Sequence, residues 1–302
     1  MRYLVKLKSP SPLSADTLAQ LTQLEIKTNR LINTPFIGNY TSVFKGQGMQ
    51  FSESRPYQPG DDVRRIDWTV TAKRQEPYIK IFEQERELTI MIIADISGSL
   101  SFGSHFQTKR EQAVQTAALL GFAANRHSDA VGLCLCADQV EHYIPPKKGR
   151  HHVLNCLAAL QTHTPKSPKT NLTAGIDYIL TLHKRPIVLA ILSDFQDPGY
   201  DAALAIAAKR HDVIPIVISD PAETQLPNAG IVSLQDPETG DTLWLDTSDS
   251  DTRHRFKTMM RIQAKQQARQ FKSLGLTPIT LQTNDSPIQA LKTYFTKRLA
   301  RQ

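Results

Sequence analysis

The spacing of hydrophobic residues divides the chain into three stretches with different patterns. In residues 1–35, leucines recur near helical spacing, which predicts one helix that begins near Ser14 or Asp16 and ends before Pro35. Residues 36–87 are rich in Gly, Pro, Arg, Asp and aromatic side chains with short alternating runs, a pattern that predicts small strands and tight turns. The rest of the chain alternates continuous apolar runs with helical patterns.

In this third stretch the apolar runs are short and rich in branched residues, which is typical of strands buried on both faces of a parallel sheet. Because the second and third runs are joined by two residues, we expect them to form an antiparallel hairpin at a sheet edge. Pro215, inside the fifth run, removes one backbone donor. Strands are predicted over residues 88–94, 131–137, 140–144, 187–192, 213–218 and 278–281, and helices over 109–126, 151–161, 172–183, 201–210, 252–274 and from 287 onward.

Alternating strands and helices predict a three-layer α/β sandwich with a mostly parallel central sheet. The change of pattern predicts two parts, an N-terminal helix and accessory strand/turn region over residues 1–87 and a larger α/β domain over residues 88–302. A further alternating segment around 231–245, which turns at 237–240, predicts a hairpin inserted into the larger domain.

The net charge of +7 is concentrated near the C-terminus, where the stretch from Thr252 onward carries eleven Lys or Arg and a single acid, Asp285. Such a stretch fits a solvated helix face, an acidic partner, nucleic acid or an anionic membrane surface. We expect no nucleic acid, because no binding motif or aromatic interleaving accompanies the charge. Peripheral membrane contact through these basic helices stays open. The sequence has no apolar run of the roughly 20 residues needed to cross a bilayer and no signal peptide, so we expect a cytoplasmic protein.

Two of the predicted strands end in carboxylates. The strand over 88–94 runs into Asp95, Ser97 and Ser99, and the strand over 187–192 runs into Asp194. Ligands of open α/β sheets bind beyond the carboxyl ends of strands, so neighbouring strands would bring the two aspartates face to face. Two close carboxylates repel unless a cation or proton separates them, and hard oxygen ligands suit Mg²⁺, with Mn²⁺ or Ca²⁺ as alternatives. The sequence therefore predicts a divalent-cation site.

The Asp-x-Ser-x-Ser run after a buried strand resembles the metal-ion-dependent adhesion site of von Willebrand factor A domains. The resemblance implies a threonine from another loop and a second aspartate as further ligands. Thr170 matches the first, with Thr173 as a competing choice, and Asp194 matches the second, although phenylalanine follows it where glycine is common. The simpler interpretation is that the strand-end side chains only cap a helix and bond their own loop.

A second resemblance lies upstream of this site. Residues 46–68, GQGMQFSESRPYQPGDDVRRIDW, together with residues 71–73, resemble the signature of the bacterial proteins catalogued as domain of unknown function 58, with Lys73 where the family usually has arginine. The resemblance extends over roughly residues 38–299. Members of that family often accompany MoxR-type AAA+ ATPases, which implies an adaptor role in complex assembly or chaperoning.

The same signature carries charges of both signs next to aromatic residues, and three interpretations are open. Its arginines could fork onto aspartates in an internal network that holds the accessory region against the sheet, it could form a partner-docking surface, or Asp61 and Asp62 could hold a second metal. The residues concerned are Arg55, Asp61, Asp62, Arg64, Asp67 and Trp68.

Two classes of function fit the strand-end site. In the adhesion-site resemblance, the metal keeps an open position that a partner's acidic side chain completes, so the chain acts as a non-enzymatic adaptor. The alternative is a metal-dependent phosphatase or hydrolase that uses the strand-end aspartates. Haloacid-dehalogenase-type phosphatases place an acid two residues after the first aspartate, where this chain has Ser97, which cannot act as a general acid near neutral pH. Neither a Gly-x-Ser-x-Gly elbow nor a Walker A loop is present.

Overall fold

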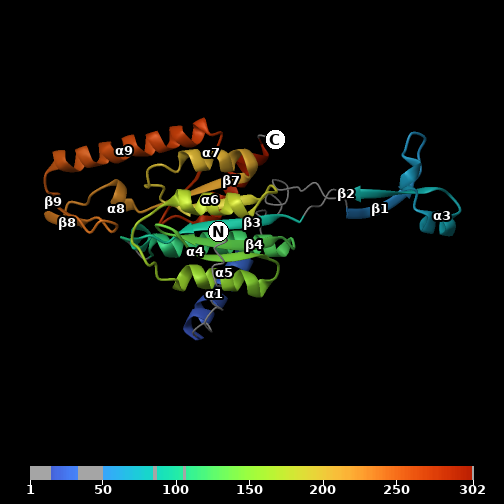
Figure 1. Ribbon diagram of the computed structural model, residues 1–302, viewed down its shortest axis with the longest axis horizontal. Helices are drawn as coiled ribbons and strands as arrows, with labels where there is room; N and C mark the ends of the chain where they lie inside the picture. The colour runs from blue at the N-terminus through green and yellow to red at the C-terminus, as the bar shows by residue number, and fades with distance from the viewer. Residues whose placement is uncertain (1–14, 33–49, 84–86, 105–106, 301–302) are drawn as a thin grey trace, which may run out of the picture.

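A six-stranded sheet forms the centre of the computed structural model, which describes residues 15–32, 50–83, 87–104 and 107–300. The strand order is β10-β7-β6-β3-β4-β5, and every neighbouring pair is parallel except β4 and β5. The predicted three-layer α/β sandwich is therefore confirmed (Figure 1). The strands are β3 (Thr89–Asp95), β4 (Ala130–Cys136), β5 (Val140–Lys147), β6 (Val188–Ser193), β7 (Asp212–Ser219) and β10 (Ile279–Gln282).

Alternation along the buried strands divides the core into two layers, since successive side chains of a strand point to opposite faces. Ile90, Ile92 and Ala94 of β3 join one core cluster, and Met91 and Ile93 join the other. Helices α1 (Ala15–Ile32), α4 (Lys109–Arg126), α5 (Arg150–Thr162) and α10 (Pro287–Leu299) cover the first face, and α6 (Leu172–Leu182), α7 (Asp201–Arg210) and the C-terminal end of α9 (Ser250–Ser273) cover the second.

The edges of the sheet agree with the predicted pairings. The antiparallel pairing of β4 with β5 confirms the expected edge hairpin, although β5 continues to Lys147 rather than ending at residue 144. Pro215 is accommodated within β7 because it lies just before Ile216, where the pairing with β10 begins. No helix of the described ranges carries an apolar stretch long enough to cross a membrane.

The predicted N-terminal helix corresponds to α1, which packs on α4 and α5. Leu21 is fully buried there, and the Glu25 carboxylate forms an ion pair with Arg150 at the start of α5, 2.6 Å from Nη2. The candidate cap Ser14, the expected end at Pro35 and residues 33–49 lie outside the described residues.

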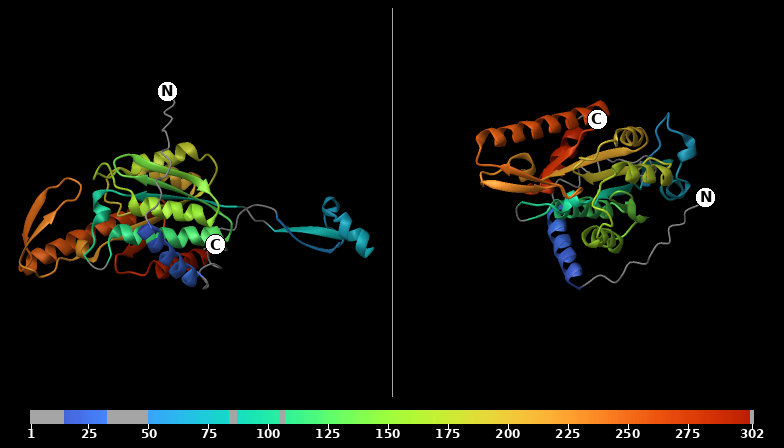
Figure 2. Two further views of the ribbon diagram at one scale, coloured as in Figure 1. Left: turned by 90° about the horizontal axis from the view of Figure 1, so that it is seen from below. Right: turned by 60° about the vertical axis from the view of Figure 1, so that its left-hand side comes forward.

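The accessory region contains the antiparallel pair β1 (Gln50–Pro56) and β2 (Tyr78–Glu83), joined through a 3-10 turn, η1 (Val63–Arg65), and helix α3 (Trp68–Arg74). Figures 1 and 2 place this unit away from the central sheet. The expectation of only strands and turns is wrong for α3. Asp67 caps this helix by accepting hydrogen bonds from the amides of Thr69 and Val70, and Gln75, with a φ of 58°, ends it in the left-handed conformation.

The predicted hairpin after β7 is present as β8 (Ile231–Gln235) and β9 (Thr242–Asp246), which pair only with each other among the described strands. The short helix α8 (Pro221–Thr224) precedes it, and α9 follows. Most of α9 is exposed, since Met259 is 55% exposed and Phe271 is the buried residue of this helix. The reason is that only the last turns of α9 reach the sheet, while its first part extends beside α8 and the hairpin (Figure 1).

We expect Ile93→Ala to lower the free energy of unfolding by about 2–5 kcal/mol, because Ile93 is fully buried in the centre of the sheet and the truncation leaves a cavity. Urea denaturation followed by circular dichroism measures the change. Ile206→Ala on α7 is the matched control, since its side chain is 46% exposed, and its loss is expected within about 0.5 kcal/mol. Equal losses for the two variants would contradict the assigned core.

Candidate functional site

Asp95 lies at the carboxyl end of β3, and the structure confirms that β6 is the neighbouring strand. The pairing of Ala94 with Leu192 brings Asp95 next to Ser193, which lies just before Asp194. The Ser193 hydroxyl donates a hydrogen bond to Asp95 Oδ2 at 2.8 Å, and the Ser97 amide donates to Oδ1 at 2.8 Å. The Asp95 side chain, which is fully buried, is thus held by one donor from each strand end.

The loop after Asp95 directs two hydroxyls to the same place. The Oγ atoms of Ser97 and Ser99 lie 3.0 Å apart, and Ser97 is fully buried. Although Ser97 precedes the 3-10 turn η2 (Gly98–Ser101), its side chain makes no capping hydrogen bond. Helix capping therefore does not account for this serine, and its hydroxyl faces Ser99 instead.

The second loop reaches this one through the backbone. The Gly98 amide donates to the Pro168 carbonyl at 2.8 Å, which brings the segment before α6 beside the two serines. In this segment the Thr170 hydroxyl donates to Glu238 Oε1 at 2.5 Å. The competing candidate, Thr173, donates instead to the Gly199 carbonyl at 3.4 Å. Thr170 is therefore the threonine that lies on the side of the strand-end loop.

Asp194 has a partner that the sequence did not suggest. Lys109, the first residue of α4, is fully buried, and its Nζ lies 2.9 Å from Asp194 Oδ2 and 2.6 Å from Glu223 Oε1. Burial by itself lowers the pKa of Lys109, but the two carboxylates raise it by more, so its net pKa is raised. A lysine at a helix start is ordinarily exposed, and no spacing links residue 109 with 194 or 223, so this ion pair had no signal in the sequence.

Burial and charge together make Asp95 costly to ionise. Desolvation and, second, repulsion from Asp194 raise the pKa of Asp95 to about 7. Lys109 pairs with Asp194 and Glu223, and no Lys or Arg in the described part of the chain forms an ion pair with Asp95.

This arrangement provides a test of whether a divalent cation fits. Within the described ranges, no group of three or more His, Cys, Asp and Glu gathers as in a zinc site. The strand-end cluster instead combines a buried carboxylate with two adjacent hydroxyls, and such hard oxygen donors suit Mg²⁺ that keeps several waters. The donors fit, and Asp95, Ser97, Ser99, Thr170 and Asp194 stay our predicted metal ligands.

The signature residues of the accessory region mostly bind one another. Arg55 forms an ion pair with Asp61 at 2.7 Å, and hydrogen bonding from Arg55 holds the pKa of Asp61 below its usual value. Asp62 accepts from the Arg64 amide at 3.0 Å, and Asp67 accepts from the Ser54 hydroxyl at 2.9 Å. Asp61 and Asp62 are therefore engaged by the unit itself, which favours an internal network over a second metal site.

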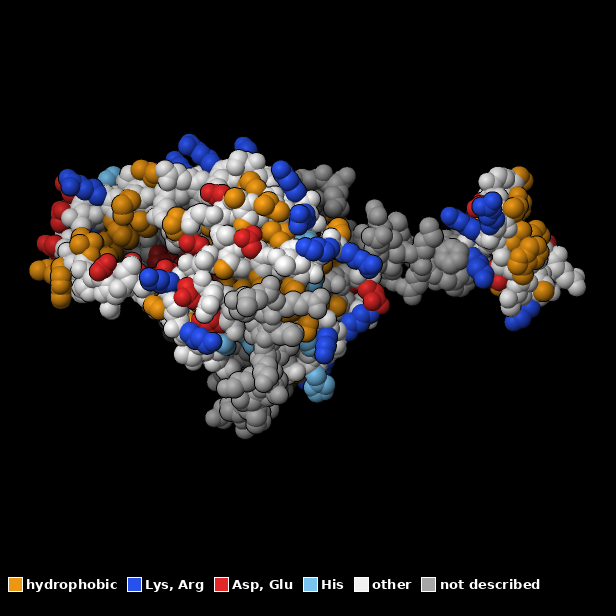
Figure 3. All heavy atoms as spheres, in the orientation of Figure 1, with side chains coloured by type: hydrophobic (Ala, Val, Ile, Leu, Met, Phe, Trp, Pro, Cys, Tyr) orange, Lys and Arg blue, Asp and Glu red, His pale blue; other side chains and the backbone are white. Residues whose placement is uncertain are grey.

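The bonds of this network lie inside the accessory unit, so they do not hold it against the sheet, as the first of the three interpretations had proposed. Trp68 is 71% exposed, and the guanidinium-bearing Arg64 and Arg65 are exposed too. Figure 3 shows apolar side chains gathered with Lys and Arg at this end of the molecule. A docking role for these residues stays a prediction.

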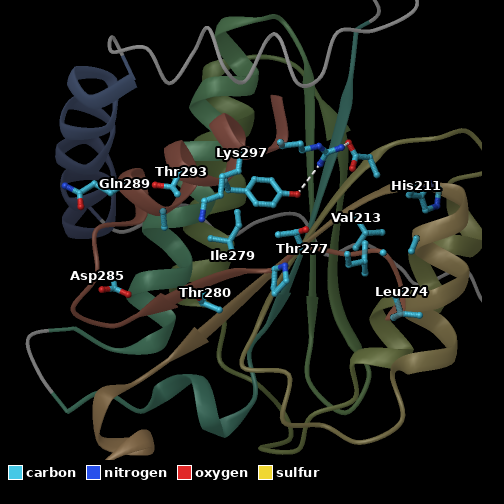
Figure 4. A pocket seen from close by; sticks show the side chains of 18 of the residues that line it. His211, Val213, Leu274, Thr277, Ile279, Thr280, Asp285, Gln289, Thr293 and Lys297 are labelled. Atoms are coloured by element: carbon cyan, nitrogen blue, oxygen red, sulfur yellow. Dashed lines mark hydrogen bonds and ion pairs between the residues drawn. The ribbon is translucent and has the colours of Figure 1, made fainter. Parts of the chain in front are cut away.

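A pocket of about 650 Å³ lies at the β10 edge of the sheet, by the amino ends of β7 and β10 (Figure 4). It is lined by the first residues of β7 and β10 and by α10, and Arg298 within it bonds the Asp212 carboxylate at 2.6 Å and the Tyr294 hydroxyl at 3.2 Å. None of the five predicted metal ligands lines it. The pocket is thus separate from the strand-end cluster.

We expect Lys109→Met to lower the free energy of unfolding by about 3–5 kcal/mol, because it leaves the buried Asp194 carboxylate without its cation. Urea denaturation at pH 7 in a chelating buffer measures the loss. The matched control is Lys169→Met, an exposed lysine whose replacement is expected to change stability by less than about 0.5 kcal/mol. A similarly small effect for Lys109→Met would show that the ion pair is not needed.

The raised pKa of Asp95 predicts a pH dependence of metal-free stability. Between its ordinary pKa of 3.8 and about 7, the folded chain binds more protons here than the unfolded chain, so this group destabilises the fold increasingly as pH rises. We expect Asp95→Asn to unfold at higher urea than the parent at pH 8 and at the same urea near pH 4, with a change of at most about 1.4 kcal/mol per pH unit. A difference that does not vary with pH would contradict the assignment.

Comparison with known proteins places the chain in a family. The sequence model described as "Protein of unknown function DUF58" matches residues 53–266. The proteins Mb1516 of Mycobacterium bovis and Rv1480 of Mycobacterium tuberculosis are each 33% identical to this chain over 225 residues, which is 74% of this chain and 71% of each relative.

Solved structures with a related arrangement include BatB from Bacteroides thetaiotaomicron, with a TM-score of 0.47 and 15% identity over 71% of this chain and 100% of that one. The SpRpn10 VWA domain is also similar, with a TM-score of 0.38 and 11% identity over 68% of this chain and 94% of that one. The match over residues 53–266 and the 33% identity to the mycobacterial relatives show that the chain belongs to the DUF58 family of proteins of unknown function.

Proposed function

We propose that this chain is a metal-dependent protein-binding adaptor. A divalent cation, Mg²⁺ first, would be held by Asp95, Ser97 and Ser99 with Thr170 and Asp194 from the other loops, and a partner's acidic side chain would complete its coordination. The observation that carries the proposal is the buried Asp95 carboxylate beside Asp194, with two hydroxyls 3.0 Å apart next to it. The cation, when bound, supplies an electrophilic position that an incoming carboxylate can occupy.

The residues of this chain would orient the site rather than react. Ser193 and the Ser97 amide hold both oxygens of Asp95, and Lys109 and the Gln196 amide hold those of Asp194, at 2.9 and 3.2 Å. Carboxylates fixed in this way lose little further freedom when a cation binds. Position 97, where a phosphatase of the haloacid-dehalogenase type has its acid, carries serine.

One observation favours the second candidate, a metal-dependent phosphatase or hydrolase. A carboxyl whose pKa is raised to about 7 can donate or accept a proton near neutral pH, as a general acid or base must. Turnover of a generic phosphate ester such as p-nitrophenyl phosphate in Mg²⁺, lost in Asp95→Ala, would support the enzyme instead of the adaptor.

We further propose that the partner is a MoxR-type AAA+ ATPase and that the pair acts in the cytoplasm in complex assembly or chaperoning. This part rests on the family membership and on the association with such ATPases that the resemblance implies. An ATPase of this class found next to the gene, and retained on the immobilised chain only with Mg²⁺, would support it.

We expect Asp95→Ala to weaken Mn²⁺ binding by more than about tenfold, because it removes the central carboxylate of the proposed site. Isothermal titration calorimetry of the full chain with Mn²⁺ alone measures this, and circular dichroism checks that the fold is intact. Asp177→Ala, an exposed aspartate on α6, is the matched control and should bind as the parent does. Equal Mn²⁺ affinity for parent and Asp95→Ala would overturn the metal-dependent proposal.

A further inference from the structure

An acidic side chain of the chain itself already reaches the strand-end cluster. The tip of the β8–β9 hairpin carries Glu238, whose Oε1 accepts the Thr170 hydroxyl at 2.5 Å and whose Oε2 lies 3.4 Å from the Thr170 amide nitrogen. Thr170 is one of the predicted metal ligands. Glu238 therefore lies beside one of the residues to which the proposed function brings the carboxylate of a partner.

The turn at the hairpin tip holds Glu238 in this direction. The Asp236 carboxylate accepts hydrogen bonds from the amides of Glu238 and Thr239, at 2.8 and 3.3 Å, and the Gly240 amide donates to the Asp236 carbonyl at 2.8 Å. Gly240 has a φ of 79°, a conformation that glycine adopts readily. The tip is thus a shaped turn with one acid pointing toward the second loop.

The strand-end loop is in turn shaped to receive the tip. A Cβ atom on Gly98 would lie 2.6 Å from the Pro237 carbonyl oxygen, a distance that real Cβ atoms do not tolerate. Gly98 separates Ser97 from Ser99, so the absence of a side chain there lets the hairpin tip close onto the two candidate metal ligands.

The contact between Glu238 and Thr170 brings another carboxylate toward the two aspartates at the strand ends. Asp95 and Asp194 place two carboxyl groups at the strand ends, of which Asp194 is paired with Lys109, and no Lys or Arg of the described residues forms an ion pair with Glu238. Bringing a third carboxylate toward such a site is unfavourable unless a cation lies among them. The hairpin pairs only with itself within the described chain, so its tip can leave without breaking the central sheet (Figure 1).

We propose that Glu238 is the internal ligand of the strand-end site, and that an acidic segment of a partner binds by displacing it. The inference rests on the proposed function, because it assigns Glu238 to the coordination position that the partner's carboxylate takes. A tethered ligand acts at an effective concentration on the order of millimolar, so it holds off acidic peptides that bind weakly and yields to a partner with a larger contact surface.

A peptide copy of the tip tests this directly. A fluorescent peptide with the sequence of residues 234–242, LQDPETGDT, is titrated with the full chain in Mg²⁺, and its anisotropy gives the dissociation constant. We expect Glu238→Gln to bind the peptide about tenfold or more tightly than the parent, because the competing tethered carboxylate is gone. Asp241→Asn, which alters a neighbouring acid of the same turn whose carboxylate accepts from the Thr239 hydroxyl at 3.0 Å, is the matched control and should bind as the parent does.

Two further arms locate the binding. The same peptide with glutamine in place of its glutamate should lose binding to Glu238→Gln, and so should the double variant Thr170→Val/Glu238→Gln with the unaltered peptide. Equal affinity of the parent and Glu238→Gln, or the absence of binding to Glu238→Gln up to millimolar peptide, would overturn the internal ligand.

A chelator separates this inference from the proposed function. If EDTA abolishes the binding of the peptide to Glu238→Gln, the metal-bridged site and its internal ligand are both supported. If the gain of Glu238→Gln over the parent persists unchanged in EDTA, Glu238 still occupies the site, but the metal-dependent function fails.

Discussion

Two carboxylates lie side by side at the ends of β3 and β6, inside a protein that cannot easily hold two unpaired charges there. Lys109 neutralises one of the two, because its fully buried ammonium group lies between Asp194 and Glu223. Hydrogen bonds from the Ser193 hydroxyl and the Ser97 amide partly stabilise the charged form of Asp95. Its pKa is nevertheless raised to about 7. The cost of a charged carboxylate at Asp95 is the physical reason to expect a cation there.

The loops around these carboxylates come from distant parts of the chain and are held together by backbone contacts rather than by ion pairs. Gly98 bonds Pro168 and makes room for Pro237, so the strand-end loop, the segment before α6 and the hairpin tip meet at one place. Glu238 on that tip accepts the Thr170 hydroxyl and so links the hairpin to the segment before α6. The pocket at the β10 edge of the sheet and the β1–β2 accessory unit contain none of the residues of this cluster. They are therefore surfaces separate from the candidate site.

The fold followed from the sequence to a large extent, because periodicity reports burial and burial is what orders an α/β sheet. Short apolar runs became the strands of the central sheet, and helix α4 spans the residues expected for it. The expectations failed where local chemistry or position overruled the pattern. Helix α3 depends on the Asp67 cap inside a stretch rich in turn residues, and β5 continues to Lys147, past residue 144 where the apolar run ends.

The chain alone was enough to place Asp95 and Asp194 at strand ends, since a carboxylate after a branched apolar run needs no long-range information. It could not say that Lys109 is buried beside Asp194, or that Glu238 reaches Thr170, because these residues are 85 and 68 positions apart. Such contacts arise only when the strand order and the path of the hairpin are known. The residue types of the candidate site can thus be read from short stretches of sequence. The pairing of Asp194 with Lys109 and the contact of Glu238 with Thr170 depend on tertiary packing.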